Sequence, residues 1–373
     1  MVKEFLKRVK KILREDRFLK NIYKTCFDKN VLISYTVLPF LINKNSHTNV
    51  QESRIIANIF KELGFNIDVI HYTNQRKIDY KKYDVIFGFG EPFENSFVDQ
   101  NLKRIYYATG AHVCHQNYAE IKRVQEVNTK YNSNILPKRL VPWNWSLSTS
   151  LSDSLIVIGN DWTKSTYEKY TTKKVLSINA TALINENSKK IFRDIEKTKK
   201  SFLWFGSSGL VHKGLDLCLE YFSEHSDLML HICGPMEDDF KEVFGSYFEK
   251  ENINYYGFIN VSSQKFIDIV SQCSFGILPT CSEGQATALL TTMGAGLIPI
   301  STKQCGVDVE KLGYLIDELK LESIDKVIQE AIVLDNLEIE SNSQTLINYI
   351  QKNHTLKSFE ENLKVLISKA INV

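Results

Sequence analysis

One segment, residues 272–300, constrains the fold more than any other part of the sequence. It begins with a short apolar run, passes through a polar loop that carries Glu283, and enters a helical pattern at about Ala286. A second apolar run follows at residues 297–300. The order strand, loop, helix, strand is typical of a parallel sheet, because strands that run the same way need a long connection between them. We therefore predict an α/β fold.

The loop before this helix is the first candidate binding site. Ligands bind open parallel sheets beyond the carboxyl ends of the strands, and Glu283 falls at such an end. The backbone N–H groups of Gln285, Ala286 and Thr287 start the helix, where they favour an anion such as a phosphate. Thr287 and Thr291 share a helix face, which suits a polyhydroxylated ligand. Ordinary helix capping explains the same residues equally well.

The alternation of strands and helices runs through the chain and restarts once. Between the two runs lies a polar, charged stretch at residues 185–200, which marks a domain boundary. We predict a first Rossmann-like domain, a linker, a second Rossmann-like domain and a C-terminal helix that packs back on the first domain, at residues 1–184, 185–200, 201–350 and 351–373. Two such sheets facing each other form a cleft, which is a common ligand site.

Bulk composition excludes several classes of protein. The 373 residues, 43% of them hydrophobic, are enough for two domains with separate cores. A formal net charge of +2 is too small to indicate a nucleic-acid partner. The seven cysteines are odd in number and scattered, which favours free thiols in the cytoplasm over a disulfide framework. No apolar run reaches the roughly 20 residues that a membrane-spanning helix needs.

The N-terminal segment, residues 1–28, has apolar residues at helical spacing and is coated with lysine and arginine. Two interpretations stay open. A helix of this kind can pack on the first domain with a solvated basic face. It can also rest on anionic lipid, which would place the protein peripherally at the inner face of the cell membrane.

Two further candidates follow other predicted strands. Lys213, in the segment GSSGLVHKGLD (206–216), can place a positive charge beside a diphosphate, although exposed lysines are common. His112 follows a strand of the first domain and can donate to a substrate, transfer a proton, or be purely structural. Cys114 and His115 lie next to it, but no second pair of ligands follows, and we expect no metal.

Residues 201–317 also resemble the donor-binding domain of family 4 glycosyltransferases, which have the GT-B fold of two Rossmann-like domains facing a cleft. The resemblance lies in FGSSGLVHKGLDL, LHICGP, YYGFI and LPTCSEGQATALLTTMGAGLIPIST, and it is weaker in the first domain. It implies a retaining, metal-independent transfer of a sugar from a nucleotide-diphosphate-sugar to an acceptor hydroxyl, in glycan or polysaccharide biosynthesis. The acceptor would be a glycan, a lipid-linked glycan or a protein. The nucleotide-sugar is a substrate, so no cofactor is implied.

The resemblance implies roles for individual residues. Lys213 resembles the diphosphate-binding lysine, Glu283 the first glutamate of an E-x7-E motif that contacts the donor sugar, and His112 a histidine near that sugar. These three would carry the catalysis. The implied donor-binding residues are Ser207, Ser208, Lys213, Gly257, Phe258, Ile259, Glu283, Gly284, Gln285, Ala286, Thr287 and Thr291. On the acceptor side, Ser46, His47 and Thr48 replace the glycine-rich loop of the family.

Two departures from the family pattern bear on the activity. The second glutamate of the motif falls on Thr291, whose hydroxyl can still bond a ribose but without charge assistance. The arginine that often accompanies the lysine falls on Ser207, so a leaving diphosphate loses one partner. An alternative therefore stays open, namely a catalytically degenerate subunit that binds nucleotide or glycan and supports an active partner.

Overall fold

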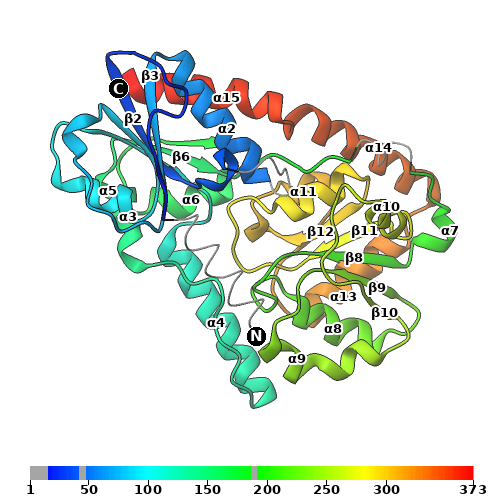
Figure 1. Ribbon diagram of the computed structural model, residues 1–373. Helices are drawn as coiled ribbons and strands as arrows, with labels where there is room; N and C mark the ends of the chain where they lie inside the picture. Colours follow the sequence, from blue (N-terminus) through cyan, green and yellow to red (C-terminus); the bar gives the residue numbers. More distant parts are fainter. Residues whose placement is uncertain (1–15, 42–47, 186–190, 373) are drawn as a thin grey trace.

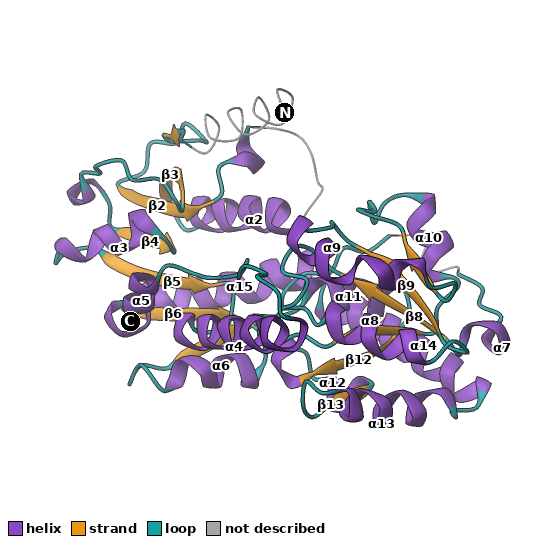
Figure 2. Ribbon diagram, turned by 90° about the horizontal axis from the view of Figure 1, so that it is seen from below, coloured by secondary structure: helices purple, strands orange, loops and turns teal. Residues whose placement is uncertain are grey.

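The computed structural model describes residues 16–41, 48–185 and 191–372, which form two α/β domains side by side (Figure 1). Each domain is built on one sheet whose strands are almost all parallel, and helices lie on both faces of each sheet (Figure 2). This arrangement confirms the predicted fold class. None of the helices among the described residues is long and apolar enough to cross a membrane.

The first sheet has the strand order β1-β3-β2-β4-β5-β6-β7, and only the pair β1–β3 is antiparallel. Its central strands are continuous apolar runs because both of their faces are covered by helices. The strands are β1 (Phe18–Leu19), β2 (Lys29–Tyr35), β3 (Phe65–His71), β4 (Val85–Gly88), β5 (Lys103–Ala108), β6 (Ser154–Ile158) and β7 (Val175–Ile178). The helices are α2 (Thr48–Glu62), α3 (Glu91–Glu94), α4 (Val113–Tyr131), α5 (Leu147–Leu151) and α6 (Asp161–Glu168).

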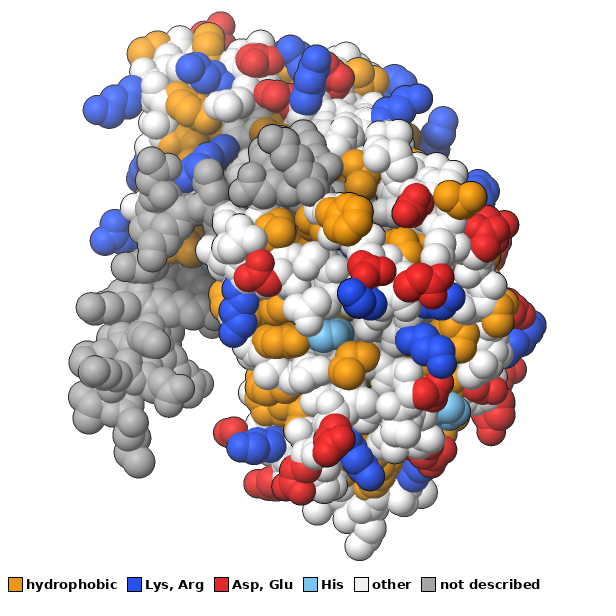
Figure 3. Space-filling view, turned by 90° about the vertical axis from the view of Figure 1, so that its right-hand side faces the viewer, with side chains coloured by type: hydrophobic (Ala, Val, Ile, Leu, Met, Phe, Trp, Pro, Cys, Tyr) orange, Lys and Arg blue, Asp and Glu red, His pale blue; other side chains and the backbone are white. Residues whose placement is uncertain are grey.

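The second sheet has the order β10-β9-β8-β11-β12-β13 and is parallel throughout. Its strands are β8 (Ser201–Phe205), β9 (Met229–Cys233), β10 (Ile253–Tyr255), β11 (Phe275–Leu278), β12 (Ile298–Thr302) and β13 (Tyr314–Ile316). Its helices are α7 (Ile195–Thr198), α8 (Leu215–Glu224), α9 (Asp238–Phe244), α10 (Gln264–Val270), α11 (Thr287–Gly294), α12 (Val309–Leu312), α13 (Leu321–Ile332) and α14 (Asn336–Asn353). The outward face of this domain carries interspersed acidic and basic side chains (Figure 3).

The described part of the N-terminal segment is not the predicted helix. Residues Phe18 and Leu19 form β1, which pairs antiparallel with the edge strand β3. Asn21 and Lys24 then adopt left-handed backbone angles, with φ of 36° and 52°, which a continuing helix cannot contain. The open edge of β3 therefore holds this segment as a strand. Residues 1–15 of the predicted helix lie outside the described residues.

The chain crosses between the domains twice. After β7 it passes through residues 179–185 towards β8, and after α14 it returns as α15 (Leu356–Asn372), which packs on α2, β5 and β7 (Figure 1). The two crossings are bonded to each other. The Ala182 N–H donates to the carbonyl of His354 over 2.9 Å, and Nδ1 of His354 lies 2.8 Å from the carbonyl of Ala180. Further along α15, Lys364 forms an ion pair with Glu62, the last residue of α2, at 2.6 Å.

Glu94, at the end of α3, makes stability depend on pH. Burial raises its pKa to about 7, aided by the charge of Glu91 and partly offset by the hydrogen bond that Ser148 donates. Between about pH 4.5 and 7 the unfolded state therefore loses this proton before the folded state does, and stability falls as the pH rises. We expect Glu94→Gln, which keeps an acceptor for Ser148, to add about 1–2 kcal/mol to the free energy of unfolding at pH 8.

Urea unfolding at two pH values checks this expectation. At pH 5 the carboxyl group is neutral in the folded wild type, so the variant should gain much less there than at pH 8. An equal gain at both pH values would show that Glu94 is ionised in the folded protein and contradict the assignment.

Candidate active site between the two domains

The candidate site is built from two loops that leave the same edge of the second sheet. β8 and β11 are parallel neighbours, so residues 206–214 after β8 and residues 279–286 after β11 both start at the carboxyl edge. Gly214, with φ of 67°, lets the two loops touch, because a side chain there would collide with the carbonyl oxygen of Pro279. The result is that Nζ of Lys213 forms an ion pair with Oε1 of Glu283.

The ion pair sits at the margin of the protein interior. The Lys213 side chain is 7% exposed and that of Glu283 is 12% exposed. Nη2 of Arg139, from the first domain, lies 4.0 Å from the other carboxylate oxygen of Glu283. Burial alone would raise the pKa of Glu283, but Lys213 and Arg139 outweigh it and lower the pKa to about 2. Glu283 is therefore an acceptor at neutral pH and no general acid.

Glu120, on α4 of the first domain, organises the side of the site that faces these loops. Its Oε1 accepts the backbone N–H groups of Lys138 and Arg139 at 2.6 and 3.1 Å. Its Oε2 lies 2.7 Å from Nδ1 of His212, whose Nε2 contacts the carbonyl of Ser282. Burial opposes ionisation of Glu120, but His212 and the two N–H groups lower its pKa. One buried carboxylate thus joins α4 to both loops.

Glu120, His212 and Cys281 together form the one group of three potential metal ligands among residues 16–41, 48–185 and 191–372, with ligand atoms within 4.8 Å of one another. Hydrogen bonds already account for this cluster, because Cys281 lies 3.2 Å from the same Nδ1 that faces Glu120. Burial raises the pKa of the Cys281 thiol, which keeps it protonated. The neighbours His112, Cys114 and His115 do not form such a group.

His112, in the first domain, is the N-cap residue of α4. Its ring is fully buried and stacks on Tyr170 at 3.9 Å. Nδ1 accepts the N–H of Cys114 at 3.2 Å, so the ring proton is on Nε2, which has no hydrogen-bond partner within the described chain. Burial and the charge of His115 lower its pKa to about 4. His112 is thus a neutral donor, and the idea that it transfers protons near neutral pH loses support.

Gly284 is pressed against the first domain rather than left open to a ligand. Its carbonyl accepts a hydrogen bond from Thr163 Oγ1 at 2.5 Å, and a side chain at Gly306 would collide with the same oxygen. A Cβ on Gly284 itself would lie 2.6 Å from the carbonyl of Thr109. Glycine at these positions allows the two backbones to meet.

The expectation of free N–H groups at residues 285–287 needs correction. The Ala286 N–H donates to the carbonyl of Cys305 at 2.8 Å, so it is not available to an anion. Gln285 turns its side chain to the first domain, where Oε1 accepts the N–H of Ala180 at 2.6 Å. Thr287 remains partly exposed, like Glu283. The helix start therefore offers a smaller anion site than the sequence predicts.

The loop after β8 also departs from expectation. Ser207 and Ser208 are exposed, as ligand-binding residues should be. The N–H groups of Gly209 and Leu210, however, donate to the carboxylate of Glu237 at 2.5 and 3.4 Å. A carboxylate of the protein itself therefore fills the anion position of this loop.

Thr291 does not join the other predicted donor-binding residues. It is 3% exposed, its hydroxyl donates to the carbonyl of Thr287 at 2.7 Å, and it accepts the N–H of Leu183 at 3.3 Å. The hydroxyl is therefore engaged with the backbone, and the suggestion that it bonds a ribose has no support.

The segment at residues 257–259 lies at the same edge as the ion pair. The carbonyl of Gly257 accepts the N–H of Gly234 at 3.0 Å, at the end of β9. Phe258 is 76% exposed, whereas Ile259 is buried. β10 and β11 are three strand spacings apart in the sheet, a distance of about 14 Å. This span matches an extended ligand that reaches from residues 257–259 to Glu283.

The predicted acceptor side is only partly described. Thr48 begins α2 and is buried. Ser46 and His47 lie outside the described residues.

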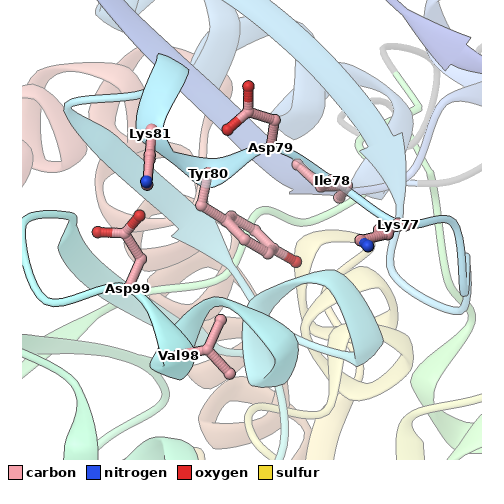
Figure 4. Close-up of a pocket in the computed structure, with 7 residues that line it drawn as sticks. All are labelled: Lys77, Ile78, Asp79, Tyr80, Lys81, Val98 and Asp99. Carbon is pink, nitrogen blue, oxygen red and sulfur yellow. The ribbon is translucent and has the colours of Figure 1, made fainter.

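A surface hollow in the first domain lies away from this site (Figure 4). It lies where β4 and β5 begin, at the edge opposite to their carboxyl ends. Its lining residues are Lys77, Ile78, Asp79, Tyr80, Lys81, Val98 and Asp99. None of the predicted site residues is among them.

Comparison with known proteins gives a family match in the second domain and several similar structures. Residues 187–349 match the model of the family described as Glycosyl transferases group 1. A search of curated proteins gives no match. At the level of structure, the chain is similar to WaaG, described as a glycosyltransferase involved in lipopolysaccharide biosynthesis, with a TM-score of 0.59, 14% identity and coverage of 90% of this chain and 99% of that one.

Two further structures have the same architecture. Sucrose-phosphate synthase from Thermosynechococcus elongatus gives a TM-score of 0.65 at 10% identity, covering 92% of this chain and 100% of that one. A glycosyltransferase from Rickettsia africae gives 0.58 at 12% identity, covering 92% and 99%. At such identities these structures establish the fold, and the family match adds the enzyme class. The chain is therefore a glycosyltransferase of GT-B fold, and its residues 187–349 match the model of the Glycosyl transferases group 1 family.

Proposed function

We propose that this glycosyltransferase moves a sugar from a nucleoside diphosphate sugar to an acceptor hydroxyl, with retention of configuration and without a metal, in glycan or polysaccharide biosynthesis. The donor would lie against the second domain and the acceptor, a glycan free or linked to lipid or protein, against the first. The observation that carries this proposal is the Lys213–Glu283 ion pair at the carboxyl edge of β8 and β11, facing the first domain.

Positive charge near the leaving group would favour this reaction. The transition state is oxocarbenium-like, and negative charge builds on the departing phosphate oxygen. The ammonium group of Lys213 would stabilise that charge from a position fixed before the reaction. Glu283, ionised and accepting, would bond the hydroxyls of the donor sugar. We assign no residue to a covalent intermediate.

His112 would act from the first domain as a hydrogen-bond donor. Its Nε2–H is buried and lacks a partner among the described residues, an arrangement that costs free energy unless a ligand supplies an acceptor. A sugar hydroxyl or phosphate oxygen in the cleft would satisfy it. The neutral ring, with its pKa lowered to about 4, suits donation and not acid catalysis.

A second candidate is a catalytically degenerate subunit that binds nucleotide or glycan and supports an active partner. Two observations favour it. The Thr291 hydroxyl is engaged with backbone groups, and Glu237 occupies the amides of the loop after β8. Lys213 and Glu283, held together, favour the enzyme.

Thermal unfolding with a panel of nucleoside diphosphate sugars tests the proposal. A donor that binds only the native state at 100 times its Kd adds about 2.7 kcal/mol to the free energy of unfolding, and we expect one or a few members to raise Tm. The matched nucleosides, which lack the diphosphate, serve as controls. Slow release of nucleoside diphosphate from the same donor would support the enzyme, whereas binding without turnover on any acceptor would support the degenerate subunit. No shift with any member would contradict the enzyme and the nucleotide-binding form of the degenerate subunit.

A further inference from the structure

We infer that Arg139, a residue of the first domain, is a second cation that binds the diphosphate of the donor, so that the diphosphate site is complete only when the two domains are together. This inference rests on the function proposed above and adds a residue to the same site.

The two loops of the second domain that form the site supply little positive charge by themselves. In the two loops at residues 206–214 and 279–287, Lys213 is the only lysine or arginine. His212 is committed to Glu120 and to the carbonyl of Ser282. A diphosphate carries more than one negative charge and is bound best by several charge-assisted hydrogen bonds. A further cation must therefore come from outside these loops.

Arg139 is the accessible charge of the site. Lys213 and Glu283 neutralise each other in a nearly buried pair, whereas the Arg139 side chain is 37% exposed. With Nη2 at 4.0 Å from Glu283, the guanidinium is too far for a hydrogen bond to that carboxylate and keeps its donors for a ligand. The three groups together carry a net charge of +1, which attracts an anion to the open side of the pair.

The position of Arg139 is fixed before a ligand arrives. Its N–H donates to Glu120 at 3.1 Å, and its carbonyl accepts Nε2 of Gln116 at 3.1 Å. The side chain then crosses the loop after β8 directly over Gly209, where a Cβ would lie 2.6 Å from Cγ of Arg139. Gly209, with φ of 87°, thus leaves room for the arginine stem. The guanidinium is thereby aimed at the edge where β8 and β11 end.

Binding of a nucleoside diphosphate and of the matching nucleoside, measured by calorimetry, tests this role. The diphosphate used is the one that corresponds to the donor identified by thermal unfolding. We expect Arg139→Ala to raise the Kd of the nucleoside diphosphate by about tenfold or more, because one charge-assisted contact is lost. The Kd of the nucleoside should not change. Arg139→Lys should recover part of the loss. Lys138→Ala is the matched control, since Lys138 is the preceding residue but pairs with Asp239 at 2.7 Å, and it should leave both affinities unchanged.

Three outcomes would overturn the inference. Unchanged diphosphate binding in Arg139→Ala is the first, and an equal loss for diphosphate and nucleoside, as expected of a merely structural residue, is the second. The third is a loss of the same size in Lys138→Ala. If Arg139→Ala does not fold, Arg139→Gln, which keeps the stem over Gly209, takes its place. A wild-type protein that binds no nucleoside diphosphate would instead refute the proposed function.

Discussion

Replacing Lys213 by alanine is expected to lower the rate of sugar transfer by at least about tenfold, and Glu283→Ala by at least as much. Loss of Lys213 removes the ammonium group that would stabilise the leaving diphosphate. It also leaves Glu283 buried without its closest counter-ion, which is costly for stability. One substitution therefore affects both catalysis and folding, and the two effects must be separated.

A double variant separates them. In Lys213→Ala with Glu283→Gln, no buried charge is left without a counter-ion, so the free energy of unfolding should recover most of what Lys213→Ala alone loses. Sugar transfer should not recover, because neither group is then present. Measurements of kcat/KM and of urea unfolding on the wild type, on Lys213→Ala and on the double variant check this. Wild-type turnover in both single variants would defeat the assignment of the site.

Replacing Arg123 by leucine is expected to lower the free energy of unfolding by about 3–5 kcal/mol. Arg123, on α4 of the first domain, pairs with Asp216, on α8 of the second, at 2.6 Å, and their side chains are only 7% and 5% exposed. Burial would lower the pKa of Arg123, but Asp216 and Glu126 raise it, so the guanidinium is charged. Without it, Asp216 remains buried between the domains with no counter-ion.

The same pair of helices offers a matched control. Lys130 of α4 pairs with Glu220 of α8, but the lysine side chain is 52% exposed. Lys130→Ala should therefore cost less than about 1 kcal/mol, as surface ion pairs do. Adding Asp216→Asn to Arg123→Leu should restore part of the lost stability. If urea unfolding shows no larger loss for Arg123→Leu than for Lys130→Ala, the buried pair does not hold the domains together as described.

The elements of the second domain follow from local sequence patterns. The strand, loop, helix and strand predicted for residues 272–300 are found as β11, the loop that carries Glu283, α11 and β12. The approach of Lys213 to Glu283 also follows, because parallel neighbouring strands put their following loops at one edge.

Other features depend on contacts with distant parts of the chain, which a local sequence pattern cannot predict. The apolar spacing of residues 1–28 predicts a helix, but at Phe18 and Leu19 the open edge of β3 decides the outcome. Arg139 lies in a stretch without regular pattern, and it belongs to the site only because Glu120 holds it there. Thr291 has a polar side chain at helical spacing from Glu283, yet the crossing segment at Leu183 covers its hydroxyl.

The paired crossings between the domains restrict how one domain could move against the other. A single flexible connection would let one half swing, twist and slide against the other. Here the two connections lie side by side and are joined by hydrogen bonds through His354. A twist of one domain against the other would break those bonds. A closing motion guided in this way would bring Arg139 back to the same place beside Glu283.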